Sequence, residues 1–181
     1  MDTRERLIET TRELLWERGY VGTSPKAIQQ RSGAGQGSMY HHFDGKSDLA
    51  FAAIEREAAA LVARAEADLG GPGSAVERVA SYLRRERDAL RGCPVGHLTM
   101  DPDVMADARL RQPVAEALAA VVERHAEVLE EARSAGDLDV EPLPTATALV
   151  AMLQGGYVLA RASGDPATYT RAVDGALALL R

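Results

Sequence analysis

The sequence predicts an all-α protein of about nine helices, and three features lead to this fold class. Apolar residues recur at helical spacing over most of the chain, whereas no segment shows strand alternation, a heptad array or an internal repeat. Aromatic residues make up only 4% of the sequence and alanine is abundant, which favours helices packed through small aliphatic side chains. Clusters of Gly and Pro mark the ends of several periodic segments.

The predicted fold begins with one amphipathic helix over residues 3–18, followed by Gly19 as its C-cap. One face of this helix collects the positions Leu7, Ile8, Thr11, Leu14 and Leu15. We expect this helix to support the segment that follows it.

Residues 23–46 have the layout of two short helices joined by a turn. Ser24 is a suitable N-cap, and Pro25 suits the first position of the first short helix. The glycine-bearing stretch 32–35 ends that helix, and a second one is expected over residues 36–42. Two short helices joined by a turn that contains Gly form a helix-turn-helix, whose second helix enters the major groove of DNA.

The second short helix carries residue types that read a groove. Met39 and Phe43 lie four positions apart and are expected to point inward, onto Leu15 and Ile28. The positions that then face outward are Gln36, Gly37, Ser38, Tyr40 and His41. A Gln side chain can bridge an adenine edge, a hydroxyl can hold a phosphate, and Gly lets the DNA backbone come close. From these residues alone, DNA binding and a purely structural corner are equal alternatives.

The distribution of charge is more informative than the formal net charge of −6. Residues 1–50 carry seven basic and seven acidic side chains, so the acidity lies in the rest of the chain. Lys26 lies on the first short helix and Lys46 at the start of the long helix that follows, where both could flank a DNA contact as point charges. This asymmetry permits nucleic-acid binding.

The remaining chain is also expected to be helical. A long helix should run from Lys46 to Leu69, and further helices are expected over residues 74–91, 113–134, 142–163 and 167–181, with a loop and a short helix over 97–110. Gly155-Gly156 permits the close approach of another helix, so we expect the two closing helices to pair with a second copy. The residues assigned to that dimer interface are Leu149, Leu153, Gly156, Val173, Leu177 and Leu180. Packing of these residues within one chain is the alternative.

Several residues of the C-terminal part are candidates for contact with a small ligand. His125 lies on the apolar face of its helix, where a core histidine satisfied by a neighbour is the favoured alternative. The other candidates are His97, Met100, Met105, Met152, Gln154 and Tyr157. No spacing of His, Cys, Asp or Glu indicates a metal site, and no phosphate loop or nucleophile motif indicates an enzyme. We therefore expect no cofactor and no catalytic residues.

The single cysteine, Cys93, excludes an internal disulfide and fits a reducing cytoplasm. Its neighbours Arg91 and His97 could activate the thiol for redox sensing, although a Cys beside Pro at a turn is more often simply packed. No apolar run approaches the roughly 18 residues of a membrane span, and no apolar signal segment follows the charged N-terminal residues. A cytoplasmic protein without a membrane partner is expected.

Residues 6–49 resemble the N-terminal domain of the TetR family of bacterial transcriptional repressors. The residues that carry this resemblance are Gly19-Tyr20, Thr23-Ser24, Ile28, Gly33, Gly37-Ser38, Tyr40, His42-Phe43, Lys46 and Leu49. The resemblance implies a homodimer with a DNA-binding domain at residues 1–48 and an effector-binding and dimerisation domain at residues 49–181. It implies contacts to bases from Lys26, Gln36, Gly37 and Tyr40, and contacts to the DNA backbone from Ser24, Ser38, His41, His42 and Lys46.

A second segment, Gly92-Cys93-Pro94-Val95-Gly96-His97-Leu98, resembles the LmrA/YxaF-like subgroup of that family. This resemblance implies an aromatic or amphipathic effector. Two places depart from the family pattern. Gln29-Gln30 stands where a small residue is usual, and Gly35 stands where an N-cap such as Ser is commoner, which should soften the start of the recognition helix.

Together these features predict a homodimeric repressor that binds palindromic double-stranded operator DNA and is released by a small-molecule effector. The alternative is a small helical ligand carrier or enzyme whose helix-turn-helix is only structural.

Overall fold

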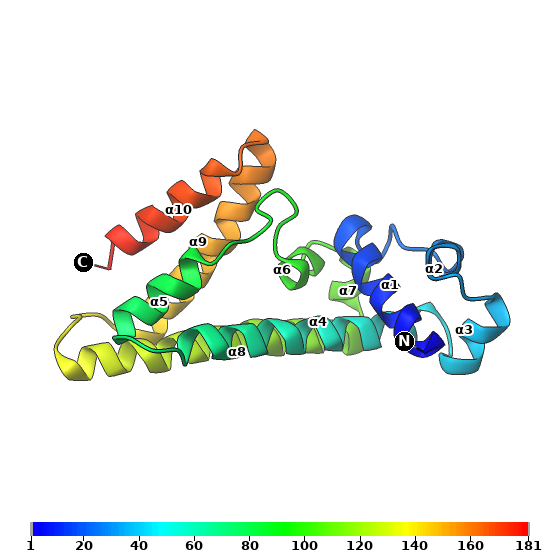
Figure 1. The fold of residues 1–181 in the computed structure, drawn as a ribbon, viewed down its shortest axis with the longest axis horizontal. Helices are drawn as coiled ribbons and strands as arrows, with labels where there is room; N and C mark the ends of the chain where they lie inside the picture. Colours follow the sequence, from blue (N-terminus) through cyan, green and yellow to red (C-terminus); the bar gives the residue numbers. More distant parts are fainter. Residues whose placement is uncertain (1, 181) are drawn as a thin grey trace. The chain divides into compact units, whose positions relative to one another are not determined.

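The computed structural model describes residues 2–180, which form ten helices and no strand (Figure 1). The predicted all-α class is confirmed. The helices are α1 (Thr3–Arg18), α2 (Pro25–Ser32), α3 (Gln36–His42), α4 (Lys46–Leu69), α5 (Ala75–Arg84), α6 (Pro94–Leu98), α7 (Pro102–Ala106), α8 (Ala108–Ala135), α9 (Pro142–Ser163) and α10 (Ala167–Ala178).

These helices pack as two compact units. The first unit comprises the residues up to Ala60 together with Pro94–Ala117, and the second comprises Leu61–Cys93 together with the residues from Leu118 onward. The α4 and α8 helices each continue from one unit into the other, and the chain also passes between the units at Cys93–Pro94. The units therefore differ from the predicted domains, because the first part of α4, the α6 and α7 helices and the first part of α8 all pack with the N-terminal helices.

The first unit is built around α1, which contacts α2, α3 and α6. The residues that helical spacing placed on one face of α1 are buried in the structure. Leu7 and Thr11 are completely inaccessible to solvent. Ion pairs then fix α1 to the middle of α4. Arg12 Nε donates to Glu57 Oε2 at 3.0 Å, and Arg56 Nη1 donates to Glu9 Oε1 at 3.1 Å. These contacts make α1 a fixed support for the two short helices.

The second unit contains α9 and α10, which run side by side in opposite directions (Figure 1), and α5 also contacts α10. The close approach of α9 to α10 depends on Gly156, since a Cβ atom there would lie 3.2 Å from the Tyr169 ring. The start of α5 is fixed by a capping box. Ser74 Oγ accepts from Glu77 N at 3.3 Å, and Glu77 Oε2 accepts from Ser74 N at 2.8 Å.

Four boundaries differ from the sequence expectation of about nine helices, and the smallest difference is at α10, which ends at Ala178 although the range 167–181 was expected. The α5 helix ends at Arg84 and not at Arg91, because the Arg87 guanidinium donates to the carbonyls of Tyr82, Leu83 and Arg85 and so satisfies acceptors that a longer helix would use. The expected loop and single short helix over 97–110 are replaced by the end of α6, by α7 and by the first turn of α8. Pro113 lies inside α8, which starts five residues earlier than its predicted beginning, at Ala108.

The α9 helix is long and apolar enough to cross a membrane by length and composition, and it is the one such helix among residues 2–180. Polar residues interrupt its apolar stretch, so the sequence shows no continuous apolar run of that length. Seven of its residues are buried within the chain, including Leu149 and Tyr157. This burial and the contact with α10 account for the apolar residues on one side of α9, while Leu143, Val158 and Leu159 on the same helix stay exposed.

Candidate nucleic-acid interface and C-terminal pocket

The predicted helix-turn-helix is confirmed in its local geometry. Ser24 caps α2, since its Oγ accepts from Ala27 N at 3.1 Å. The α2 helix ends at Gly33, whose φ of 68° and ψ of 12° place it in the left-handed region that favours Gly. Gly35 is the N-cap of α3 and offers no side-chain hydrogen bond, as the sequence indicated.

The α3 helix is divided into a buried side and an exposed side as predicted. Met39 is completely buried and Phe43 is 4% exposed, so both belong to the core of the first unit. Tyr40 is 51% exposed. The other outward positions are exposed at Gln36, Gly37, His41 and His42 and partly exposed at Ser38. Apart from its chain neighbours and the backbone of α3, no heavy atom of the described residues lies within 4 Å of the point where a Cβ atom on Gly37 would stand, so this face offers room to a DNA backbone.

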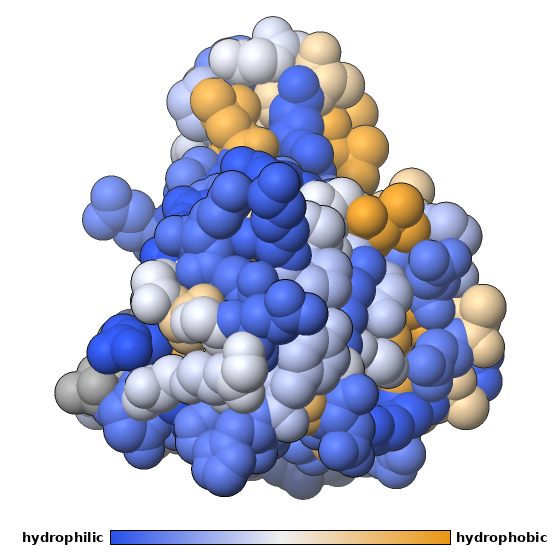
Figure 2. Space-filling model, turned by 90° about the vertical axis from the view of Figure 1, so that its right-hand side faces the viewer, coloured by the Kyte–Doolittle hydropathy of each residue, from blue (hydrophilic) through white to orange (hydrophobic). Residues whose placement is uncertain are grey.

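The surface around α3 is polar. Figure 2 looks onto the end of Figure 1 where α2 and α3 lie, and hydrophilic residues cover most of the face that it shows. Lys26 and Ser24 are exposed at the start of α2. A polar, accessible helix following a fixed turn is the arrangement through which such motifs contact DNA.

Lys46, the first residue of α4, is held against the same unit. Its Nζ lies 3.8 Å from the centroid of the Tyr20 ring, a cation–π contact. Burial lowers the pKa of Lys46, and the nearby carboxylates of Asp101 and Asp103 act in the opposite direction. The ammonium group is therefore placed by Tyr20 and is only partly accessible to a phosphate.

Asp101 is a residue of this unit that the sequence analysis missed. It caps α7, and its side chain also accepts from the backbone N–H groups of Tyr20 and Val21 in the turn after α1. The local signal was present, since an Asp directly before Pro is typical of a helix start. Its second set of partners lies about 80 residues away, where sequence spacing gives no information.

The predicted effector residues are divided between the two units. His97, Met100 and Met105 belong to the first unit, and Met100 is 80% exposed. His125, Met152, Gln154 and Tyr157 belong to the second unit. Tyr82, Arg87 and Tyr169 also adjoin His125 or Tyr157 in that unit. Sequence spacing does not indicate these residues, because Tyr82 and Tyr169 reach their partners from other helices and Arg87 lies in the segment after α5.

His125 is completely buried in the second unit. Its Nδ1 lies 2.7 Å from the carbonyl oxygen of Val121, and its ring meets the Tyr82 ring edge to face at 4.4 Å. Burial lowers the pKa of His125, and a backbone hydrogen bond only partly offsets that effect. Because a carbonyl can only accept, Nδ1 carries the proton and the neutral ring presents Nε2 as an acceptor. This Nε2 has no hydrogen-bond partner among residues 2–180.

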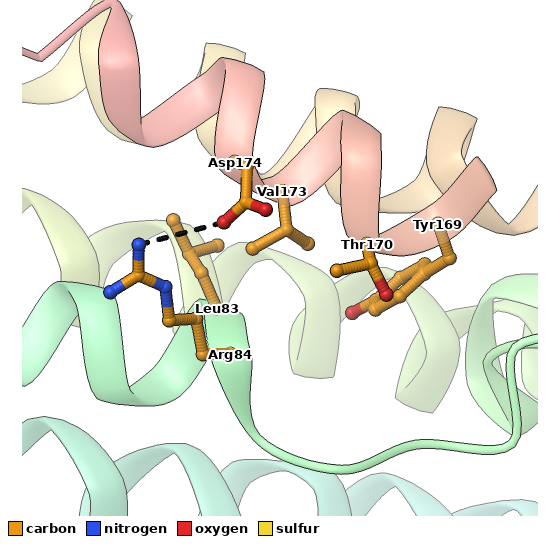
Figure 3. Close-up of a pocket in the computed structure, with 6 residues that line it drawn as sticks. All are labelled: Leu83, Arg84, Tyr169, Thr170, Val173 and Asp174. Atoms are coloured by element: carbon orange, nitrogen blue, oxygen red, sulfur yellow. Dashed lines mark hydrogen bonds and ion pairs between the residues drawn. The ribbon is translucent and has the colours of Figure 1, made fainter. Parts of the chain in front are cut away.

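A pocket of about 250 Å³ opens between α5 and α10 (Figure 3). Tyr169 lines it, and its ring also stacks on Tyr157 at 4.7 Å. Arg84 and Asp174 form an ion pair across the pocket with a separation of 3.5 Å. The Tyr169 hydroxyl is buried close to the Tyr157 hydroxyl and the Arg87 guanidinium. Burial raises the pKa of Tyr169, so the hydroxyl is a neutral donor or acceptor.

The six residues assigned to a dimer interface are all buried within one chain. Gly156 faces Tyr169 and Ala172 of the same chain, whereas Gly155 has open space where a Cβ atom would stand. The large apolar side chains that stay exposed in this region are Leu143, Val158, Leu159 and Leu179. A second groove, of about 310 Å³, runs between α9 and α10 beside Met152 and Leu179. These exposed residues are the ones available to a partner.

Cys93 is buried in the second unit. Among residues 2–180 no group of three His, Cys, Asp or Glu side chains could hold a metal ion.

The fold and the exposed α3 helix define a helix-turn-helix DNA-binding protein. Two matches give the family. Residues 7–53 match the bacterial regulatory proteins of the tetR family, and residues 73–176 match the tetracyclin repressor-like C-terminal domain. The second match alone covers more than half of the chain. The chain therefore belongs to the TetR family and is a helix-turn-helix transcriptional regulator.

Individual relatives agree with this assignment. The transcriptional regulator LmrA of Bacillus subtilis is 26% identical over 166 residues, which cover 87% of this chain and 86% of LmrA. YxaF of the same species is 26% identical over 113 residues, or 59% of each chain. The crystal structure of reduced E. coli NemR has a TM-score of 0.85 at 25% identity and covers 97% of this chain and 95% of NemR. The resemblance to LmrA and YxaF noted from the sequence is confirmed.

Proposed function

We propose that this chain is a homodimeric repressor that binds a palindromic operator through two copies of α3 and releases it when a small effector binds. The observation that carries this proposal is the exposed polar side of α3, held on a buried Met39 in a chain of the TetR family. NemR of E. coli, 27% identical over 172 residues, is named a transcriptional repressor. DNA reading is assigned to residues 1–48, and effector binding and dimerisation to residues 49–181. The place of action would be the bacterial cytoplasm.

The DNA contacts fall into two groups. Base edges would be contacted by Lys26, Gln36, Gly37 and Tyr40, which are all exposed. The DNA backbone would be contacted by Ser24, Ser38, His41, His42 and Lys46. Backbone contacts fix the position of the protein, and base contacts supply the specificity.

Two copies of the chain would associate through the outward side of α9 and α10. Val158 is 65% exposed and Leu179 is 77% exposed, and single large apolar side chains at this exposure are stabilised when a partner removes them from water. Gly155, with open space beside it, would let a partner helix come close. A two-fold dimer presents two recognition helices to two half-sites, as a palindrome requires.

The effector would bind in the second unit near His125 and Tyr169. The His125 Nε2 atom is buried without a hydrogen-bond partner in residues 2–180, and the Tyr169 hydroxyl is also buried. The aromatic rings of Tyr82 and Tyr157 adjoin these two side chains. Because Nε2 of the neutral His125 can only accept, an effector that reaches it must offer an N–H or O–H donor. An amphipathic or aromatic molecule with such a group fits these surroundings.

The test is a gel shift with the full-length protein and the DNA upstream of its own gene. We expect sequence-selective binding that weakens as salt rises, since phosphate contacts release counterions. Tyr40→Ala should lower operator affinity by about tenfold or more and leave the oligomeric state unchanged. Leu90→Ala is a matched control, because Leu90 is also exposed but lies in the second unit. Absence of selective binding by the unaltered protein would favour the ligand-carrier alternative.

A further inference from the structure

The side chain of Asp101 joins two backbone segments of the first unit. Its Oδ2 accepts from Tyr20 N at 2.7 Å and from Val21 N at 3.0 Å. Its Oδ1 accepts from Asp103 N at 3.1 Å and from Val104 N at 3.3 Å. Asp101 is only 8% exposed. One buried carboxylate therefore uses both oxygens, one for the turn after α1 and one for the start of α7.

The turn that Asp101 holds leads directly into the helix-turn-helix. Gly19 opens it with a φ of 70°, and a Cβ atom at Gly19 would lie 2.9 Å from Asp101 Oδ2, so the carboxylate occupies the space that the glycine leaves free. Thr23 closes the turn, since its Oγ1 donates to the Gly19 carbonyl at 2.7 Å. The next residue, Ser24, is the N-cap of α2. Asp101 thus holds a turn that is closed by its own hydrogen bond and is followed directly by the N-cap of α2.

The same turn also places Lys46. Tyr20, whose backbone N–H binds Asp101, carries the Lys46 ammonium on its ring at 3.8 Å. Asp101 thereby acts on two of the elements that face DNA, the start of α2 and the first residue of α4.

Asp101 comes from a segment with a distinctive position in the chain. It lies within residues 73–176, which match the C-terminal domain of the family, yet it packs in the first unit with the N-terminal helices. The chain enters this segment from the second unit at Cys93–Pro94.

We propose that Asp101 is a positioning residue for operator binding, and that it is the joint through which the α6–α7 segment holds the α1–α2 turn in its DNA-binding arrangement. The proposal rests on the proposed function as an operator-binding regulator. A displacement of α7 would draw Oδ2 away from the Tyr20 and Val21 amides and release the turn. Asp101 would touch neither DNA nor effector.

An isosteric substitution of Asp101 by Asn tests this role of the carboxylate. Asn has the shape of Asp but only one acceptor oxygen, and its amide group is a donor. In Asp101→Asn the oxygen can therefore serve either the Tyr20 and Val21 amides or the Asp103 and Val104 amides. The other pair loses its acceptor. Asp107→Asn is the matched control, because Asp107 caps α8 through Oδ1 alone, accepting from Arg109 N at 2.9 Å.

The experiment compares the full-length protein, Asp101→Asn and Asp107→Asn by amide hydrogen exchange and by operator binding. In Asp101→Asn we expect faster exchange at one of the two amide pairs and an operator affinity lowered by about tenfold, the effect of losing hydrogen bonds to a charged acceptor. In Asp107→Asn we expect unchanged exchange at Tyr20 and Val21 and unchanged affinity. Gly19→Ala, which crowds Oδ2, should reproduce the effects of Asp101→Asn.

Two results would overturn the proposal. The first is unaltered exchange at all four amides in Asp101→Asn. The second is an operator affinity in Asp101→Asn equal to that of Asp107→Asn. Failure of the proposed function would look different, because the unaltered protein itself would then bind no operator DNA.

Discussion

The outward sides of α3 and α9 differ in chemistry, although both helices bury one side in the same way. On α3 the exposed positions are polar residues and Gly37, opposite the buried Met39. On α9 the accessible positions that recur at helical spacing are small or apolar: Pro144, Ala148, Ala151, Gly155 and Val158. A polar helix surface is suited to a hydrated, charged partner such as DNA, whereas an apolar one is stabilised by another apolar surface. The outward side of α3 is therefore suited to DNA, and the outward side of α9 is suited to another apolar protein surface.

The largest effect on association and operator affinity is expected from placing a charge on the apolar outward side of α9. Val158→Arg should prevent association of two chains, because the guanidinium would be buried in an apolar contact without a partner. Loss of one of two linked half-site contacts should lower operator affinity by about 100-fold. Sedimentation velocity and a gel shift measure the two effects.

The control for Val158→Arg is Leu90→Arg, which adds the same charge at another exposed apolar position of the second unit. It should leave association intact. If Val158→Arg is still a dimer, the apolar side of α9 is not the contact between chains.

A second difference concerns histidines. His125 is completely buried in the second unit, whereas His41 is exposed on α3. Burial lowers the pKa of His125 below its ordinary value of 6.5, so the unfolded chain binds this proton more readily than the folded chain. The free energy of unfolding should therefore decrease as pH falls from about 6.5 towards the lowered pKa. Urea unfolding across this pH range measures it.

His125→Phe should remove this part of the pH dependence, whereas His41→Gln should leave it in place. The same dependence in His125→Phe as in the unaltered protein would show that another group is responsible.

A smaller effect is expected at Gly37, where stability and binding should change in opposite directions. Gly37→Ala places a methyl group in open space on α3 and should raise the free energy of unfolding by up to about 1 kcal/mol. The same methyl group would stand where the DNA backbone approaches, so operator affinity should fall. Thermal unfolding measures the change in stability, and fluorescence anisotropy with labelled operator measures the change in affinity. Higher affinity in Gly37→Ala would contradict close approach at this position.

The smallest effect is expected at Gly35. Its φ of −67° and ψ of 159° are accessible to Ser, and open space surrounds it. Gly35→Ser would add the missing side-chain acceptor at the start of α3 and should raise the free energy of unfolding by a few tenths of a kcal/mol. Chemical denaturation detects the change, and Gly35→Ala, which adds a side chain without an acceptor, is the control. An equal gain from both variants would argue against capping as the cause.

The features that the sequence predicted well are local. The α1, α2 and α3 helices follow from caps and apolar spacing within a few residues of one another, and the buried positions of Met39 and Phe43 follow from the same spacing. The features that it missed depend on long-range contacts. The end of α5 depends on Arg87 turning back onto carbonyls, and the role of Asp101 depends on partners 80 and 81 residues away.

Gly155 and Gly156 show most clearly what cannot be predicted from the sequence. They are adjacent in sequence and identical in chemistry, yet only Gly156 lies against α10. Adjacent positions on a helix point about 100° apart, so the sequence showed that a close approach was possible without showing which glycine makes it. The same reasoning applies to the six residues assigned to the dimer contact, which share α9 and α10 with the exposed residues but point into the chain.

The position of α6 and α7 in the first unit has a consequence for modular engineering. A chimaera that joins the first 48 residues of this chain to the remainder of another regulator would separate Tyr20 and Val21 from the carboxylate that binds their amides. A fusion at one junction would therefore transplant an incomplete module. To carry its specificity into a new protein, this chain would have to contribute a second, non-contiguous insert that contains Asp101.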